Sequence, residues 1–408
     1  MMKKRLPRVL LTFILLLSLC TNAYAAPPTV GNTRAHAKSR DWARQMVGAS
    51  YAAEHGITGK GVKVAIIDSG LSSEFSQYSN AKVLTGKNLL VSADSPERSD
   101  VTDRNGHGTF VASIIAGSAY GFAPEVTLLP FRIFSGTQSS IVAAANAIRE
   151  AVKAGCDVIN MSFGFPNDEP VLREAIAEAR SKGVILVAAV GNRIVGQPIS
   201  GPSTIQYPVA YPGVIGVGAV DAEKKISSFS LQNEFVDIVA PGSGVYGLSA
   251  ATLKYKPSDG TSFSTPMVVA AAALARSVDP TITADRFLAL MQETAEDLGA
   301  PGRDDVYGGG LLNLGLLLAT LRRDEGSLIV SKCGGDSFLS AYWDIPAQKD
   351  AVLCVAEYDQ SGRFLSLRQQ TLHPGRNYWN NVPQVAAHVS ATVLDRRSSA
   401  VLCPVLTD

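Results

Sequence analysis

Three short stretches of the sequence place polar side chains where strands are expected to end or helices to begin. The apolar run of residues 62–67 has the length of a buried strand and leads into Asp68. His107 and Ser262 each follow a glycine-containing turn and precede an apolar, helix-competent run. A carboxylate, an imidazole and a hydroxyl can act as orienting acid, general base and nucleophile in acyl transfer. The stretches therefore predict a serine nucleophile at a helix start, where the helix dipole favours a developing oxyanion.

Each stretch by itself has a simpler interpretation. A serine at the start of a helix most often serves as an N-cap, and Asn192, which follows Gly191, would by itself be taken as a turn residue. Ser264 lies close to Ser262 and carries the same hydroxyl. It is the combination of the three stretches, in the order Asp, His, Ser, that favours catalysis over these alternatives.

Many further motifs of the chain resemble those of the subtilisin-like serine proteases, the subtilase family. The resemblance runs from about residue 58 to about residue 313 and keeps the motifs in order. It implies an α/β fold, a doubly wound and mostly parallel sheet of the subtilisin type. The matching segments are residues 61–70, 107–109, 121–124, 157–164, 188–192, 211–215, 240–242 and 260–262.

The resemblance also implies a role for each catalytic residue. Ser262, rather than Ser264, matches the family nucleophile, because the alignment is anchored on the preceding Gly-Thr and the following Pro. His107 would take and return the proton, and Asp68 would hold its tautomer. Asn192 matches the residue whose side-chain N–H stabilises the oxyanion together with the backbone N–H of Ser262.

By the same resemblance, a protein or peptide substrate would lie as an extended strand beside Ser162, Phe163 and Gly164. Ala189 would help to wall the primary specificity pocket. Gln206 stands where many relatives carry a small residue at the pocket floor, so we expect a shallower and more polar pocket.

The pattern of the domain alternates apolar runs with amphipathic ones, as a doubly wound parallel sheet requires. The expected strands are residues 62–67, 126–131, 158–162, 185–189 and 214–220, and the expected helices are residues 108–116, 140–154, 170–182, 265–276 and 314–321.

The N-terminus has the features of a bacterial export signal. A basic start and an apolar run precede Ala23-Tyr24-Ala25, so residues 1–25 are predicted to be a signal peptide that is removed after Ala25. A membrane anchor, or lipoprotein cleavage before Cys20, is the alternative. Residues 26–50 would then be an arm packed on the outside or partly mobile, and the mature protein would be periplasmic or secreted, without membrane attachment.

The chain changes character after the predicted peptidase domain, residues 51–325. Residues 326–408 show short apolar stretches separated by turns, which predicts a small β-rich C-terminal domain. Residues 351–358 would pair with 363–372, and 391–394 with 400–406. The sequence indicates no function for this part.

Composition excludes several classes of function. The chain has 408 residues, of which 46% are hydrophobic and 18% charged, with a formal net charge of +1. This argues against extensive disorder and against nucleic-acid binding. No cofactor is expected, and no metal is assigned, because the acidic loop containing Asp94, Glu97, Asp100 and Asp103 is interpreted as solvated.

The cysteines leave one question open. Cys156 is expected to be a buried, inert thiol. Cys333, Cys354 and Cys403 permit one disulfide in an oxidising compartment, and the sequence does not identify the pair.

Two other functions use the same fold. A catalytically silent binding protein would have lost some of the catalytic positions, whereas a peptide ligase or cyclase would pass the acyl group to an amine instead of water. The intact set of positions favours hydrolysis. The segment before the peptidase domain is too short for a folded pro-domain, so the protein either folds unaided or uses a separate helper or inhibitor chain.

Overall fold

The computed structural model of the chain describes residues 40–136, 138–193, 198–322, 327–333, 336–345, 351–359, 361, 363–372, 375–381, 388–395 and 406–407. The predicted signal peptide and the first part of the predicted arm lie outside these residues. Within the described part, no helix has the length and apolar character needed to cross a membrane.

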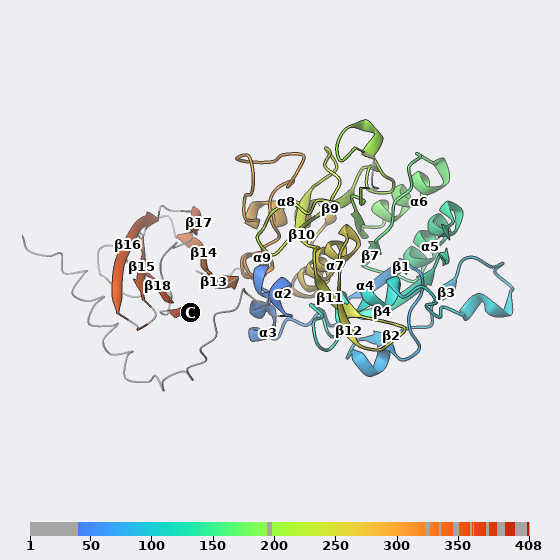
Figure 1. Cartoon of the computed structure of the whole chain (residues 1–408), viewed down its shortest axis with the longest axis horizontal. Helices are drawn as coiled ribbons and strands as arrows, with labels where there is room; N and C mark the ends of the chain where they lie inside the picture. The colour runs from blue at the N-terminus through green and yellow to red at the C-terminus, as the bar shows by residue number, and fades with distance from the viewer. Residues whose placement is uncertain are drawn as a thin grey trace, which may run out of the picture.

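An eight-stranded parallel sheet lies at the centre of the predicted peptidase domain (Figure 1). Its principal strands follow the order β10-β9-β8-β7-β1-β4-β2, and β3 also pairs with β4. Nearly every residue of the central strands is buried, because helices cover both faces and leave no position for a polar side chain. The strands are β1 (Lys63–Asp68), β2 (Lys82–Val83), β3 (Lys87–Asn88), β4 (Thr127–Arg132), β7 (Val158–Met161), β8 (Ile185–Ala189), β9 (Val214–Val220) and β10 (Ile238–Pro241).

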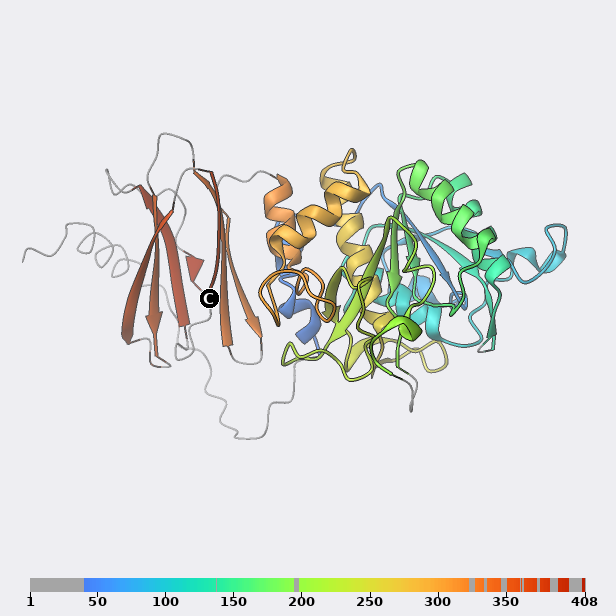
Figure 2. The same ribbon diagram turned by 90° about the horizontal axis from the view of Figure 1, so that it is seen from above.

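Two groups of helices lie on opposite faces of this sheet (Figures 1 and 2). On one face α4 (His107–Ala116) packs against α7 (Thr261–Val278), which also contacts strands β7 to β10. On the other face α5 (Ile141–Lys153) packs against α6 (Pro170–Ser181). These layers confirm the predicted doubly wound α/β fold. Two further helices follow α7 in the chain: α8 (Ala284–Thr294), which was not predicted, and α9 (Leu314–Arg322).

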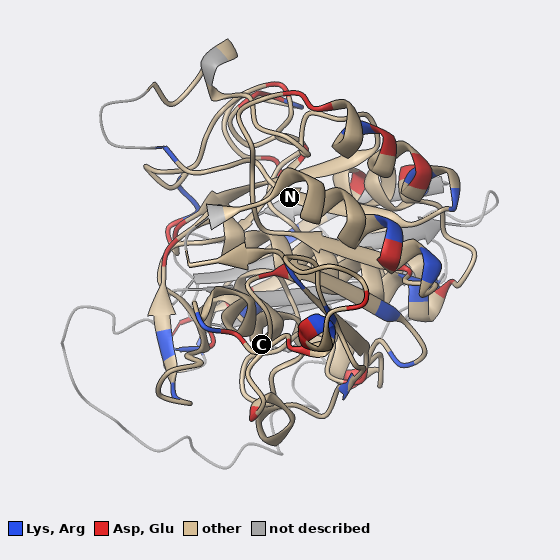
Figure 3. Cartoon of the chain, turned by 90° about the vertical axis from the view of Figure 1, so that its right-hand side faces the viewer, with Lys and Arg blue, Asp and Glu red and all other residues tan. Residues whose placement is uncertain are grey.

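Smaller elements lie around the sheet. Figure 3, which views the chain from the right-hand side of Figure 1, shows acidic and basic positions interspersed along the ribbon. The two-stranded elements are β5 (Phe134–Ser135) with β6 (Gln138–Ser139), and β11 (Val245–Leu248) with β12 (Tyr255–Ser258). The 3-10 turns are η2 (Phe75–Tyr78), η3 (Pro96–Ser99) and η4 (Pro202–Thr204).

The described part of the predicted arm does not lie loosely on the outside. It forms the short helix α2 (Trp42–Met46), whose Trp42 is only 5% exposed, and α3 (Ser50–Glu54) begins at the last residue of the arm. The backbone carbonyl of Val47 accepts hydrogen bonds from the first turn of α9. The apolar residues of this segment therefore belong to the hydrophobic core, because removing their side chains from water is favourable; they are Trp42, Ala43, Met46, Val47 and Ala49.

The C-terminal strands form two antiparallel sheets. β15 (Ala351–Tyr358) pairs with β16 (Phe364–Leu372), which confirms the first predicted hairpin. β18 (His388–Asp395) pairs with both β15 and β19 (Leu406–Thr407). Most of the second predicted hairpin's returning strand lies outside the described residues. A sheet of β13 (Ser327–Cys333), β14 (Asp336–Ile345) and β17 (Gly375–Asn381) was not predicted, because polar residues interrupt its apolar pattern.

The described thiols are consistent with an inert role. Cys156 and Cys354 are buried and free. Burial raises the pKa of the Cys156 thiol to about 12, which keeps it protonated and poorly nucleophilic. Cys403 lies outside the described residues, and the pairing question is therefore not settled.

Candidate active site

Asp68 and His107 meet at the carboxyl end of the central strand. Asp68 is the last residue of β1 and is fully buried, whereas His107 is the first residue of α4. The ring Nδ1–H of His107 donates to Asp68 Oδ1 at 2.8 Å, with Oδ2 at 3.0 Å. The backbone N–H of Ser69 donates to the same Oδ1 at 2.7 Å. The carboxylate thus fixes the imidazole tautomer that leaves Nε2 free to accept a proton.

Close backbone contact between α4 and β1 makes this meeting possible. A Cβ on Gly108 would lie 2.2 Å from the carbonyl oxygen of Gly70, so only glycine lets the start of α4 approach the end of β1. The backbone N–H of Gly108 donates to Ser69 Oγ at 2.9 Å, which ties the two elements together.

Asp103 supports the histidine loop, and the sequence analysis missed this role. Its carboxylate is buried and accepts five hydrogen bonds, two of them from the backbone N–H and hydroxyl of Thr109. The others come from Ser69 Oγ at 2.8 Å and from the backbone N–H groups of Asn105 and Gly106. The expectation of a solvated acidic loop is therefore wrong for Asp103. The Asp-x-Asn-Gly pattern, typical of a side-chain-capped turn, could have revealed it.

The environment of His107 sets a testable pH dependence. Burial lowers its pKa, but the charge and hydrogen bond of Asp68, with a further contribution from Asp103, raise it above the ordinary 6.5. Only the neutral imidazole can accept a proton. We therefore expect kcat/KM for peptide hydrolysis to fall as the pH decreases through a midpoint above 6.5. A pH series with one peptide substrate measures this, and an acid limb centred below 6 would contradict it.

Ser262 lies in the first turn of α7, four residues before Pro266. Pro266 has no N–H to donate, so the carbonyl of Ser262 lacks its usual helix partner. Ser162 Oγ donates to that carbonyl instead, at 2.9 Å. The hydroxyl of Ser262 in turn donates to the carbonyl of Ser162 at 3.2 Å. These two bonds hold the helix start against the end of β7. Because Ser162 Oγ replaces the donor that Pro266 lacks, α7 begins at Thr261, earlier than predicted.

Asn192 lies directly beside this turn. Its Oδ1 accepts hydrogen bonds from the backbone N–H and the hydroxyl of Thr261, both at 3.0 Å. The bonds orient the side chain and direct the amide nitrogen toward Gly260, whose hypothetical Cβ would lie 3.5 Å from Nδ2. Gly260 has a φ of 152°, a conformation that side chains rarely allow.

Ser264 is positioned quite differently from Ser262. It is fully buried, and its hydroxyl donates to the carbonyl oxygens of Ala240 and Pro241, both at 3.0 Å. The hydroxyl therefore ties α7 to β10 and is not available to an external carbonyl group.

The predicted substrate-binding residues surround the same end of the sheet. Ser162 and Phe163 are largely buried just after β7, while Gly164 is exposed. Ala189 ends β8. The side chain of Gln206 fills the space between two glycines: a Cβ on Gly164 would lie 3.1 Å from its Oε1, and one on Gly191 would lie 3.1 Å from its Cγ. The polar side chain of Gln206 therefore lies between Gly164 and Gly191, and its place at the pocket floor stays a prediction.

Among the described residues, no group of three or more potential metal-binding side chains is present.

Comparison with known proteins identifies the family of the chain. The family model described as the subtilase family matches residues 59–310, well over half of the chain. The chain belongs to the subtilase family. Subtilisin DY from Bacillus licheniformis is 37% identical over 268 residues, covering 64% of this chain and 91% of that protein. Subtilisin Savinase from Lederbergia lenta is 34% identical over 283 residues, covering 68% of this chain and 98% of its own.

Solved structures support the same fold. MycP1, solved with its N-terminal propeptide removed, superposes with a TM-score of 0.58 at 29% identity and covers 68% of this chain and 96% of its own. A protease from Pseudoalteromonas arctica reaches a TM-score of 0.60 at 23% identity, over 69% of this chain and 97% of its own. Its low identity makes this a likeness of fold alone. As a subtilase, the chain is a serine endopeptidase.

Proposed function

We propose that this subtilase is exported and hydrolyses proteins or peptides through an acyl-enzyme formed on Ser262. The observation that carries the proposal is the hydrogen bond from His107 Nδ1 to the buried carboxylate of Asp68, beside a helix whose first turn holds Ser262. An oriented base next to a serine at a helix start is the arrangement that activates a hydroxyl nucleophile.

In the proposed reaction, rotation about the Cα–Cβ bond of Ser262 turns its hydroxyl from the Ser162 carbonyl toward His107. The oxygen attacks the peptide carbonyl carbon while His107 takes the proton. The C–N bond then breaks, and His107 gives the proton to the departing amine. Water attacks the ester by the same route, which releases the acid and restores Ser262.

The oxyanion formed in each step would lie at the N-terminus of α7. The backbone N–H of Ser262 and the amide nitrogen of Asn192 supply the two donors, and the helix dipole adds to their field. The acyl half of the substrate would extend along Ser162, Phe163 and Gly164, with a side chain entering the pocket bordered by Ala189 and Gln206.

Asn192→Ala is expected to lower kcat by about 10²- to 10³-fold, because one oxyanion donor is lost while substrate contacts remain. The matched control is Thr261→Val, which removes the Thr261 hydroxyl bond to Asn192 Oδ1 but keeps the amide donor. It should cost only a few-fold. Steady-state kinetics on one peptide measures both, and equal losses would show that Asn192 acts only as a structural support.

A fluorophosphonate probe tests the proposed function as a whole. Labelling of the purified protein together with casein hydrolysis supports it, and a folded protein that does neither contradicts it. The proposed export is tested separately by the N-terminal sequence of the processed protein, which should begin at Ala26. A separate folding helper would be indicated if activity on refolding requires an added chain.

A further inference from the structure

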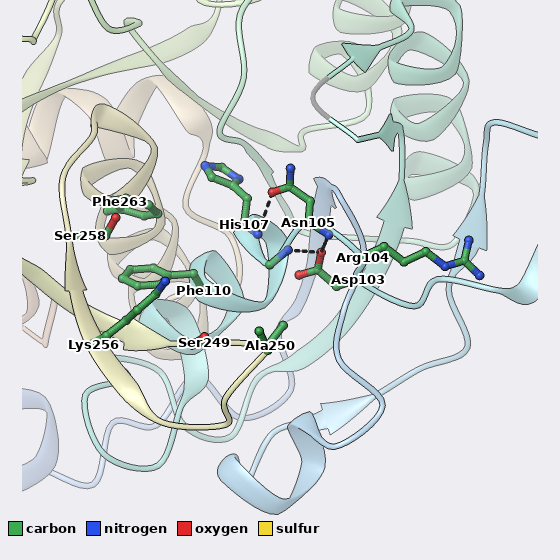
Figure 4. A pocket seen from close by; sticks show the side chains of 12 residues that line it. Asp103, Arg104, Asn105, His107, Phe110, Ser249, Ala250, Lys256, Ser258 and Phe263 are labelled. Carbon is green, nitrogen blue, oxygen red and sulfur yellow. Dashed lines mark hydrogen bonds between the residues drawn. The ribbon is translucent and has the colours of Figure 1, made fainter.

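A hollow of about 460 Å³ adjoins His107 on the side of Phe263, the residue after the proposed nucleophile (Figure 4). The ring of Phe263 lies 5.6 Å from that of His107 and 4.4 Å from that of Phe110, measured between centroids. The loop of residues 249–251 and the strand β12, which carries Lys256, complete the border. The hollow thus combines an aromatic wall with a cationic side chain.

If the enzyme works as proposed above, the part of the substrate that follows the cleaved bond would lie in this hollow. This assignment rests on the proposed function. The acyl half lies toward Ser162, whose carbonyl is 3.2 Å from Ser262 Oγ. His107 must deliver its proton to the amine that leaves, so the chain beyond the cleaved bond has to pass His107 on the other side. That side is the hollow beside Phe263.

The charge that an incoming side chain can reach in the hollow is cationic, because Asp103 is buried and Lys256 is exposed. Asp103 is its acidic residue, but both carboxylate oxygens are occupied by donors from Ser69, Thr109 and the loop backbone. Arg104 extends away from the centre of the hollow in Figure 4 and pairs with Asp100 at 2.8 Å.

Lys256 is the cation that remains available. It is exposed on β12, which is held in register by its pairing with β11. In the part of the chain that the structure describes, no carboxylate forms an ion pair with it. An ammonium group without an internal partner, beside apolar ring surface, suits a side chain that has both methylene groups and a carboxylate.

We propose that Lys256 is a specificity-determining residue, which makes the enzyme prefer an acidic side chain at one of the first two positions beyond the cleaved bond. The methylene groups of a glutamate would pack against Phe263 while its carboxylate pairs with Lys256. Because such a pair is exposed, its contribution is modest, and the expected preference for Glu over Gln is about three- to fivefold in kcat/KM.

Internally quenched peptides that differ only in Glu, Gln or Lys at these two positions test the preference. The wild-type enzyme should cleave them in the order Glu, Gln, Lys. Lys256→Gln should bring the three rates together, and Lys256→Glu should reverse the order. Lys254→Gln, an exposed lysine of the same hairpin that does not border the hollow, should leave the wild-type order intact.

Salt gives an independent readout, because an exposed ion pair is screened. The Glu preference of the wild type should shrink when NaCl is raised from about 0.05 to 1 M, whereas cleavage of the Gln peptide should change little. Equal rates for all three peptides with an active enzyme would overturn the proposal while leaving the proposed function in place. A folded protein that cleaves no peptide and is not labelled by the fluorophosphonate would overturn both.

Discussion

Ser262→Ala is expected to lower kcat for peptide hydrolysis by roughly 10⁶-fold and to abolish fluorophosphonate labelling. The methyl group cannot attack the carbonyl carbon, and the remaining groups can only bind the substrate and stabilise an oxyanion formed by water. The protein should stay folded, because the bond between Ser162 Oγ and the carbonyl of residue 262 does not depend on the hydroxyl. Circular dichroism and a labelling gel together separate loss of chemistry from loss of fold.

Ser264→Ala is the matched control for this experiment. It removes a hydroxyl from the same helix, but one that donates to the carbonyls of Ala240 and Pro241 inside the core. We expect the free energy of unfolding to fall by about 1 kcal/mol, while labelling and kcat stay near the wild-type values. If the Ser264 variant were the one to lose labelling, the assignment of the nucleophile would have to be reversed.

Asp68→Asn should have the second largest effect, a loss in kcat of roughly 10⁴-fold. An asparagine can keep the hydrogen bond from the backbone N–H of Ser69 by directing Oδ1 toward it. Its NH₂ group then faces Nδ1 of His107 and favours the tautomer with the proton on Nε2. That tautomer cannot accept the proton of Ser262.

The same substitution should also move the acid limb of the pH profile. The Asp68 carboxylate raises the pKa of His107 by its charge and by its hydrogen bond, and asparagine removes both effects. Burial still lowers the pKa, so the residual activity should persist to lower pH than in the wild type. An acid limb unchanged by Asp68→Asn would contradict the coupling between the two residues.

Asp157→Asn is the control for a carboxylate at the opposite end of β1. Asp157 Oδ2 accepts a hydrogen bond from the backbone N–H of Lys63 at 2.8 Å, far from the proposed active site. Its replacement should cost some stability, by about 1 kcal/mol, and leave both kcat and the pH profile unchanged.

The sequence by itself was sufficient to place the proposed catalytic residues on the elements where the structure has them. Asp68, His107 and Ser262 were predicted at a strand end and at two helix starts, and the structure places them there. This succeeded because the signals are local: a buried strand is a continuous apolar run, and a tight turn before a helix needs glycine. The order of the motifs then indicated the family.

The same local signals failed where folding brings distant residues together. Asp103 looked like one member of a solvated acidic loop, but its carboxylate is buried by donors from Ser69 and Thr109. Trp42 looked like part of an arm and is instead in the core. Burial depends on what packs against a segment. The local sequence does not indicate which distant residues those will be.

The environment of each functional group was likewise decided by the tertiary structure. The role of Pro266 depends on the carbonyl of Ser262, which it leaves without a helix donor, and on the Ser162 hydroxyl, which reaches that carbonyl from the end of β7. The location of Lys256 at the border of the hollow that also adjoins His107 depends on the pairing of β11 with β12. Sequence patterns thus determined which residue types begin and end the elements, whereas the packing of those elements determined which side chains meet, because contacts, burial and charge act through space and not along the chain.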